Sequence, residues 1–161
     1  MSHIENFPIP KGHYVKVVDL QLDKQNVEIT FNPKKKIALI FICLNQRFWQ
    51  YLKEVNETAD KFFLTNHQVD KFIWTDMPDR PYKATYFETD GCEWPMPTLM
   101  RYHLMLQQEE VLKDYDYVFY CDTDMRFVNP VDDEILGEHL TVAPHPGYHL
   151  ARRFIPPYEP N

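Results

Sequence analysis

Residues 36–44 read KIALIFICL, and every residue after the initial lysine is apolar. A continuous apolar run that is rich in isoleucine is typical of a strand buried on both faces of a parallel sheet. Because helices cover the faces of such a sheet, this run predicts an α/β fold.

The patterns that follow this run agree with an α/β fold. Residues 48–64 place apolar side chains at helical spacing among charged ones, which predicts an amphipathic helix. Strands are predicted at 71–75 and 82–88, a second helix from Thr98 to about residue 113, and a strand at 117–121. The second helix is marked by Leu99, Tyr102, Met105, Leu106 and Leu112. This order predicts a Rossmann-like, mainly parallel sheet flanked by helices.

Weaker patterns lie at the two ends of the chain. Partial alternation of apolar residues suggests short strands at 14–18 and 27–31, and another is expected at 140–143. We interpret residues 1–35 as an N-terminal extension.

Composition restricts the class of protein. The chain has 161 residues, of which 44% are hydrophobic, enough for one domain with a core. Its net charge of -7 argues against binding to nucleic acid, which needs clustered cations. The longest apolar run is far shorter than the roughly 20 residues of a membrane span, and no signal peptide is visible, so we expect a cytoplasmic protein. Cys43, Cys92 and Cys121 are expected to be free thiols.

The strongest chemical signal is Asp122-Thr123-Asp124, directly after the strand predicted at 117–121. Two carboxylates at the carboxyl end of a buried strand can share Mg²⁺ or Mn²⁺ and leave coordination positions for phosphate oxygens. The alternative is a polar turn in which an aspartate caps the local backbone.

Other candidates lie near the same predicted edge of the sheet. Asp76 can contact a base or a ribose hydroxyl, or form an Asx turn. Residues 41–43 and Asn45 can form a pocket floor, although core packing explains Phe41 equally well. Arg101 is predicted in the first turn of a helix, where a cation is unfavourable, so it either contacts an anion or sugar or is solvated. His145 lies on a predicted tight turn suited to binding a sugar hydroxyl.

Several common catalytic classes lack their motifs. The chain contains no Gly-x-Ser-x-Gly nucleophile motif, no Gly-x-Gly-x-x-Gly and no Walker loop. A serine hydrolase and an ordinary dinucleotide or ATP site are therefore not expected.

Seven short segments between Lys36 and Asn161 occur in an order that resembles a known family. They are residues 36–41, 57–63, 94 with 98–101, 119–125, 134–136, 145–148 and 158–159. With these segments the chain resembles the retaining glycosyltransferase family of the histo-blood group A and B transferases and the α-1,3-galactosyltransferases, and is most similar to its soluble bacterial and phage members. The resemblance implies a GT-A nucleotide-binding fold. It also implies metal-dependent transfer of galactose or N-acetylgalactosamine from a UDP-sugar to a galactoside or fucosylated glycan, in α-1,3 linkage.

The resemblance also implies roles for individual residues. Asp122 and Asp124 would hold Mn²⁺ or Mg²⁺ and the diphosphate, and His145 and Tyr148 would contact the acceptor. The remaining donor and nucleotide positions are Phe41, Ile42, Cys43, Phe48, Asp76, Thr98, Arg101 and Thr123.

The family's later regions, which include its proposed catalytic carboxylate, are expected beyond Asn161. Residues 36–161 would then form the UDP-sugar-binding part of a domain that is incomplete at its C-terminus. The first hypothesis is a hexosyltransferase, and the alternative is a fragment that binds UDP-sugar and Mn²⁺ without turnover. A third, a phosphoester-hydrolysing metalloenzyme, would need further metal ligands at suitable spacing.

Overall fold

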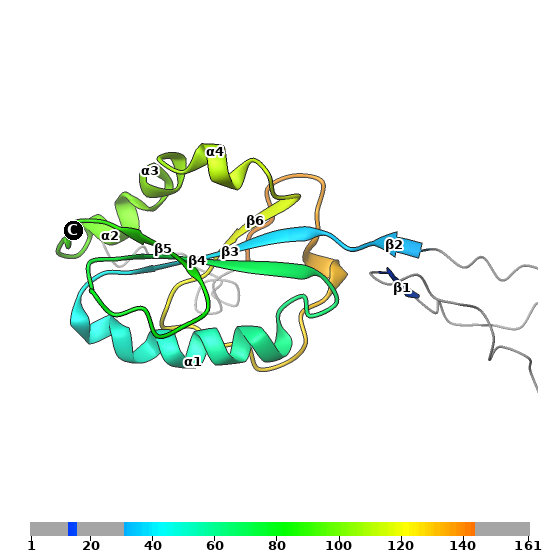
Figure 1. Cartoon of the computed structure of the whole chain (residues 1–161), viewed down its shortest axis with the longest axis horizontal. Helices are drawn as coiled ribbons and strands as arrows, with labels where there is room; N and C mark the ends of the chain where they lie inside the picture. The colour runs from blue at the N-terminus through cyan, green and yellow to red at the C-terminus, as the bar shows by residue number, and fades with distance from the viewer. Residues whose placement is uncertain (1–12, 16–30, 144–161) are drawn as a thin grey trace, which may run out of the picture.

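A four-stranded parallel sheet forms the centre of the computed structural model, which describes residues 13–15 and 31–143 (Figure 1). The strands are β3 (Lys36–Cys43), β4 (Gln68–Thr75), β5 (Thr85–Glu88) and β6 (Tyr117–Tyr120), in the order β5-β4-β3-β6. Every neighbouring pair is parallel. The predicted α/β class and its main strands are confirmed.

The central strand β3 is buried on both faces, as its apolar run predicts. Ile37, Leu39 and Phe41 contribute to the hydrophobic cluster on one face of the sheet, and Ala38 and Ile40 to the cluster on the other. Each of these side chains is at most 1% exposed. Alternate residues of a strand point to opposite faces, so a strand buried on both sides needs no polar positions.

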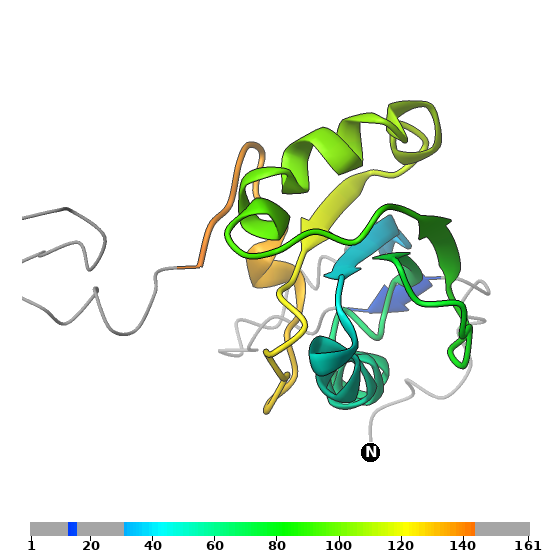
Figure 2. The ribbon, with the colours of Figure 1, turned by 90° about the vertical axis from the view of Figure 1, so that its left-hand side faces the viewer.

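Helix α1 (Gln46–Phe62) covers one face of the sheet, as Figures 1 and 2 show. Its buried residues include Leu52, Val55 and Ala59, which lie three or four positions apart and form one apolar stripe. The side chain of Asn45 caps the helix by accepting a hydrogen bond from the Arg47 N–H at 3.1 Å. The predicted helix is confirmed, with its start two residues earlier than expected.

The opposite face is covered by three short helices rather than by the single helix predicted from Thr98. They are α2 (Met96–Leu99), α3 (Arg101–Leu106) and α4 (Glu109–Leu112). Gln108 interrupts the helical backbone with φ −115° and ψ 26°. Leu104 and Leu112 are buried, whereas Leu99, Tyr102 and Leu106 are each at least 65% exposed. The prediction of one continuous helix was wrong because the backbone leaves the helical conformation at Gln108, and three of the five residues that marked the helix do not face the core.

The remaining elements lie around the sheet. β1 (His13–Val15) and β2 (Phe31–Pro33) form an antiparallel pair that overlaps the strands predicted in the N-terminal extension. The 3-10 helix η1 (Asp133–Ile135) is tied to the start of β4 by His67, whose Nε2 lies 2.9 Å from Asp133 Oδ1. His67 Nδ1 accepts a hydrogen bond from the Lys35 N–H at 3.0 Å, so Nε2 is the donor toward Asp133.

Residues 140–143 do not form the predicted strand. Leu140 and Val142 are 89% and 72% exposed, so their alternation with polar residues does not reflect burial against a sheet. Among the helices of the described residues, none combines the length and the apolar character that crossing a membrane requires.

Candidate functional site

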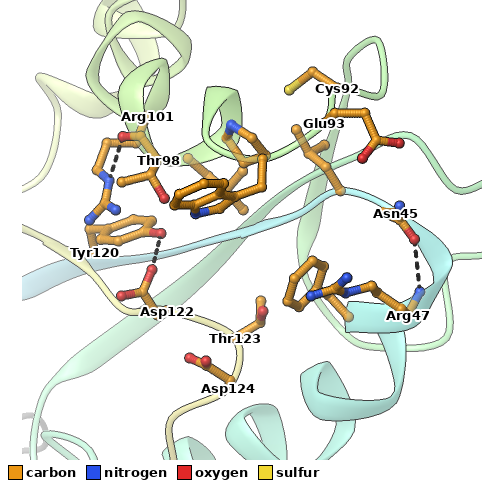
Figure 3. Close-up of a pocket in the computed structure, with 15 residues that line it drawn as sticks. Asn45, Arg47, Cys92, Glu93, Thr98, Arg101, Tyr120, Asp122, Thr123 and Asp124 are labelled. Carbon is orange, nitrogen blue, oxygen red and sulfur yellow. Dashed lines mark hydrogen bonds between the residues drawn. The ribbon is translucent and has the colours of Figure 1, made fainter. Parts of the chain in front are cut away.

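A cavity of about 350 Å³ lies at the carboxyl ends of β3 and β6, between α2, α3 and the start of α1 (Figure 3). Loops that follow parallel strands converge at this edge of a sheet, which is where ligands bind in open α/β folds. The cavity is lined by Ile42, Leu44, Asn45, Arg47, Phe48, Cys92, Glu93, Trp94, Pro97, Thr98, Arg101, Tyr120, Asp122, Thr123 and Asp124.

The two acids that follow β6 both line this cavity. Asp122 and Asp124 are exposed, whereas Thr123 between them is only 6% exposed. The Met125 N–H donates to the Asp122 carbonyl oxygen at 3.2 Å, which closes a turn around the pair. The backbone therefore turns here, as the alternative expected, but backbone atoms rather than an aspartate side chain close the turn, and both carboxylates line the cavity.

Tyr120 and Arg101 form a wall of the cavity beside Asp122 (Figure 3). The Tyr120 hydroxyl donates to Asp122 Oδ1 at 2.5 Å. The Arg101 guanidinium carbon lies 4.7 Å from the centroid of the Tyr120 ring, and Arg101 Nε donates to the Thr98 carbonyl oxygen at 3.0 Å. Burial, and then the hydrogen bond to Asp122, raise the pKa of Tyr120, so its hydroxyl remains a donor.

The loop from β3 to α1 borders the cavity on the other side. Asn45 adopts φ 78° and ψ 133°, a backbone conformation that is unfavourable for a residue with a Cβ atom. Its N–H donates to both carboxylate oxygens of Asp76, at 3.0 and 3.2 Å. An added Cβ at Gly91 would lie 2.5 Å from Asp76 Oδ2, so only glycine leaves room for this carboxylate. Asp76 thus holds the loop in its strained shape.

Replacing Asp76 with alanine is expected to lower the free energy of unfolding by about 1 kcal/mol, because the Asn45 N–H loses its acceptor. Asp76→Asn is the matched control, since its amide oxygen can still accept the hydrogen bond. Urea denaturation followed by circular dichroism measures both variants. If Asp76→Ala were as stable as the original chain, the hydrogen bond would not support the loop.

The structure brings eight of the predicted site residues together around the cavity: Ile42, Asn45, Phe48, Thr98, Arg101, Asp122, Thr123 and Asp124. Phe41 and Cys43 instead face α1 on the opposite side of β3, and both are 0% exposed. They do not line the cavity because alternate residues of β3 face opposite sides, and Ile42 takes the position toward it. Asp76 lies behind Asn45 and does not line the cavity. His145 and Tyr148 lie outside the described residues.

Sequence reasoning missed several residues that line the cavity, chiefly Arg47, Glu93, Trp94 and Tyr120. Tyr120 precedes Asp122 by two positions, and residues at this spacing in an extended chain point to the same side. That spacing is a signal that could have identified Tyr120. Arg47 and Glu93 gave no comparable signal, because single charged residues are usually solvated.

The charges around the cavity bear on which ligand it can hold. The lining contains three acids, Asp122, Asp124 and Glu93, and two cations, Arg47 and Arg101, so its net charge is negative. A diphosphate at this site would need a divalent cation to offset the repulsion. No described cluster of three or more His, Cys, Asp or Glu side chains could hold a metal ion by itself. Two carboxylates fit a cation that takes its other ligands from substrate phosphates and water, as Mg²⁺ commonly does.

Comparison with known proteins finds similar glycosyltransferases. Globoside alpha-1,3-N-acetylgalactosaminyltransferase 1 of Homo sapiens is 28% identical over 153 residues, covering 82% of this chain and 44% of the human protein. The Mus musculus protein of the same name is 29% identical, covering 74% of this chain and 35% of its own length. The Canis lupus familiaris protein is 29% identical, with coverage of 82% and 44%.

This chain is a distant homologue of these transferases. The similarity agrees at a coarse level with the glycosyltransferase family indicated by the sequence motifs. The chain spans less than half the length of the relatives it matches. No model of a protein family matches it.

The three cysteines are free, as predicted, but their thiols differ in environment. Burial raises the pKa of Cys43 to about 12, with a smaller effect from Asp76. Burial, Asp122 and Asp124 raise the pKa of Cys121 to about 12. A raised pKa favours the protonated thiol, so at pH 8 both groups are almost entirely in the unreactive thiol form.

Labelling with a disulfide reagent at pH 8 is therefore expected to modify Cys92 first, since this half-buried side chain lines the open cavity. The rates at Cys43 and Cys121 should rise about tenfold per pH unit below pH 12 while the chain stays folded. Mass spectrometry of peptides locates the label, and Cys92→Ser is the control. A fast phase that persists in Cys92→Ser would contradict the assignment.

Proposed function

We propose that this chain forms the donor-binding part of a metal-dependent retaining glycosyltransferase. The donor would be UDP-N-acetylgalactosamine or UDP-galactose, and the acceptor a galactoside. The observation that carries the proposal is that Asp122, Asp124 and Arg101 face one cavity at the carboxyl edge of a parallel sheet, in a distant homologue of α-1,3-N-acetylgalactosaminyltransferases. Because the relatives are named for N-acetylgalactosamine, its UDP-sugar is the first donor to test.

The residues around the cavity divide into an aromatic and an ionic region suited to a nucleoside diphosphate. The rings of Phe48 and Trp94 line the cavity, and the Arg47 guanidinium covers one face of Phe48 at 4.6 Å from its centroid. A base would stack on the other face of Phe48, and such stacking is favourable for any base. Asp122 and Asp124 would hold Mn²⁺ or Mg²⁺, which when bound supplies positive charge to the departing diphosphate. Arg47 and Arg101 can donate hydrogen bonds to phosphate or sugar oxygens, and Thr98 adds a hydroxyl.

Titration of the chain with UDP by calorimetry tests donor binding. We expect UDP to bind about 100-fold more tightly with MnCl₂ than with EDTA, because the cation offsets the negative charge of the carboxylates that line the cavity. UMP, which lacks the second phosphate, and ADP, which has another base, are the controls. UDP affinity that is the same with and without Mn²⁺ would contradict the proposal.

Binding and turnover are separate questions because the chain spans 44% of the human relative. Transfer of labelled sugar from UDP-N-acetylgalactosamine or UDP-galactose to a galactoside supports the transferase. Mn²⁺-dependent UDP binding without transfer or donor hydrolysis supports the second candidate, a UDP-sugar-binding unit.

A further inference from the structure

The Tyr120 hydroxyl donates a hydrogen bond to Oδ1 of Asp122, one of the two acids that follow β6. Tyr120 is the last residue of β6, and Asp122 follows two positions later, so both side chains project to the same side. The Asp122 Oδ1 atom therefore already has a donor. Its Oδ2 atom receives no hydrogen bond from another described residue and is left for a ligand.

The packing of the Tyr120 ring fixes where its hydroxyl lies. The partly buried Tyr120 ring packs against the hydrophobic cluster that contains Leu104 and Leu112. The Arg101 guanidinium lies over the same ring and is itself held by the Thr98 carbonyl oxygen. The ring is thus fixed by contacts that do not involve its hydroxyl, whereas Asp122 is exposed and has no comparable packing.

We infer that Tyr120 is a positioning residue, whose hydroxyl orients the Asp122 carboxylate so that Oδ2 faces the cation and diphosphate. This inference rests on the proposed function. A donor to a ligating carboxylate restricts its rotation and tunes its strength as a ligand, and loss of such a partner typically weakens metal affinity 10- to 100-fold. The ring of Tyr120 also contacts the Arg101 guanidinium at the same wall of the cavity. One side chain therefore positions both Asp122, which would bind the cation, and Arg101, which would bind an anion.

Tyr120→Phe tests this role because it removes the hydroxyl and keeps the ring against which Arg101 lies. The variant is expected to fold, since the exposed Asp122 can bind water instead. Tyr117→Phe is the matched control: Tyr117 lies on the same strand, contacts the cluster on the α1 side and does not line the cavity. Free Mn²⁺ is measured by electron paramagnetic resonance in titrations with UDP, which needs no enzyme activity.

We expect Tyr120→Phe to weaken Mn²⁺ binding in the presence of UDP about tenfold, and Tyr117→Phe to leave it unchanged. In chains that also carry Asp122→Ala, studied at millimolar Mn²⁺, Tyr120→Phe should have no further effect, because alanine leaves the Tyr120 hydroxyl no side chain to orient. Unchanged Mn²⁺ affinity in Tyr120→Phe, or the same loss with Asp122→Ala present, would overturn the positioning role alone. If the original chain bound no UDP with Mn²⁺, the proposed function would fail and this inference with it.

Discussion

Replacing Asp122 or Asp124 with asparagine is expected to weaken UDP binding in the presence of Mn²⁺ by about 100-fold. Hard divalent cations prefer anionic oxygen ligands, and an amide supplies a neutral oxygen in place of the carboxylate. Loss of a partner of a ligating group typically costs 10- to 100-fold in metal affinity, so loss of a ligating charge should reach at least the upper end of this range. Because asparagine has nearly the same shape, the fold should be retained.

Calorimetry with UDP, in MnCl₂ and in EDTA, measures this effect. Asp132→Asn provides the control, since Asp132 is an exposed acid ten residues after Asp122 and does not line the cavity. The variants at Asp122 and Asp124 should lose the difference between MnCl₂ and EDTA, whereas Asp132→Asn should keep it. If the two variants bound UDP with unchanged affinity and metal dependence, both the transferase and the donor-binding unit would be rejected.

Replacing Phe41 with alanine is expected to lower the free energy of unfolding by about 3–5 kcal/mol. Phe41 is 0% exposed within the cluster between β3 and α1, so its loss leaves a cavity that the surrounding side chains fill only in part. This cost is a large fraction of the stability of an ordinary domain. Urea denaturation followed by circular dichroism gives the value, and Phe41→Leu should lose less.

For Phe48→Ala we expect the reverse balance, a smaller loss of stability and a loss of UDP affinity. The two variants therefore distinguish a core residue from a cavity residue. Phe48 is half-buried, packs against the edge of the cluster on the α1 side and lines the cavity, so its loss should cost less stability than the loss of Phe41. Phe48→Ala should weaken UDP binding about tenfold, since stacking of a base on an aromatic ring is worth about 1–3 kcal/mol. A folded Phe41→Leu variant that loses UDP affinity while Phe48→Ala keeps it would contradict this assignment.

The sequence was most informative where side-chain pattern and burial coincide. The run in β3 predicts a doubly buried strand, and the positions of Ile37 to Leu44 confirm it with exposures of 8% or less. The prediction of a single helix from residue 98 was wrong because, in that segment, apolar pattern and burial do not coincide. Apolar residues occur on more than one side of that segment, and pattern alone does not distinguish Leu104, which is buried, from Tyr102, which is exposed.

The candidate site was predicted only in part, for a related reason. Acids that follow a buried strand must emerge at the carboxyl edge of the sheet, so Asp122 and Asp124 could be located from sequence. Phe41 and Ile42 are adjacent, and which of the two faces the cavity depends on which helix covers which side of the sheet. Glu93 and Trp94 reach the cavity from a loop between β5 and α2, and the path of a loop depends on tertiary contacts that sequence spacing does not report.

The pairing of β6 with β3 also has a consequence for how the chain folds. Lys36 and Asp116, which join the start of the two strands by a hydrogen bond, are 80 residues apart. The pair β3 and β4 is joined through α1 alone and closes a much shorter loop, so its loss of chain entropy is smaller. Long-range parallel pairing is slow to form, and we expect β6 to join the sheet after β3, α1 and β4 have assembled. Since Asp122 and Asp124 follow β6, the two carboxylates would reach their places in the cavity late in folding.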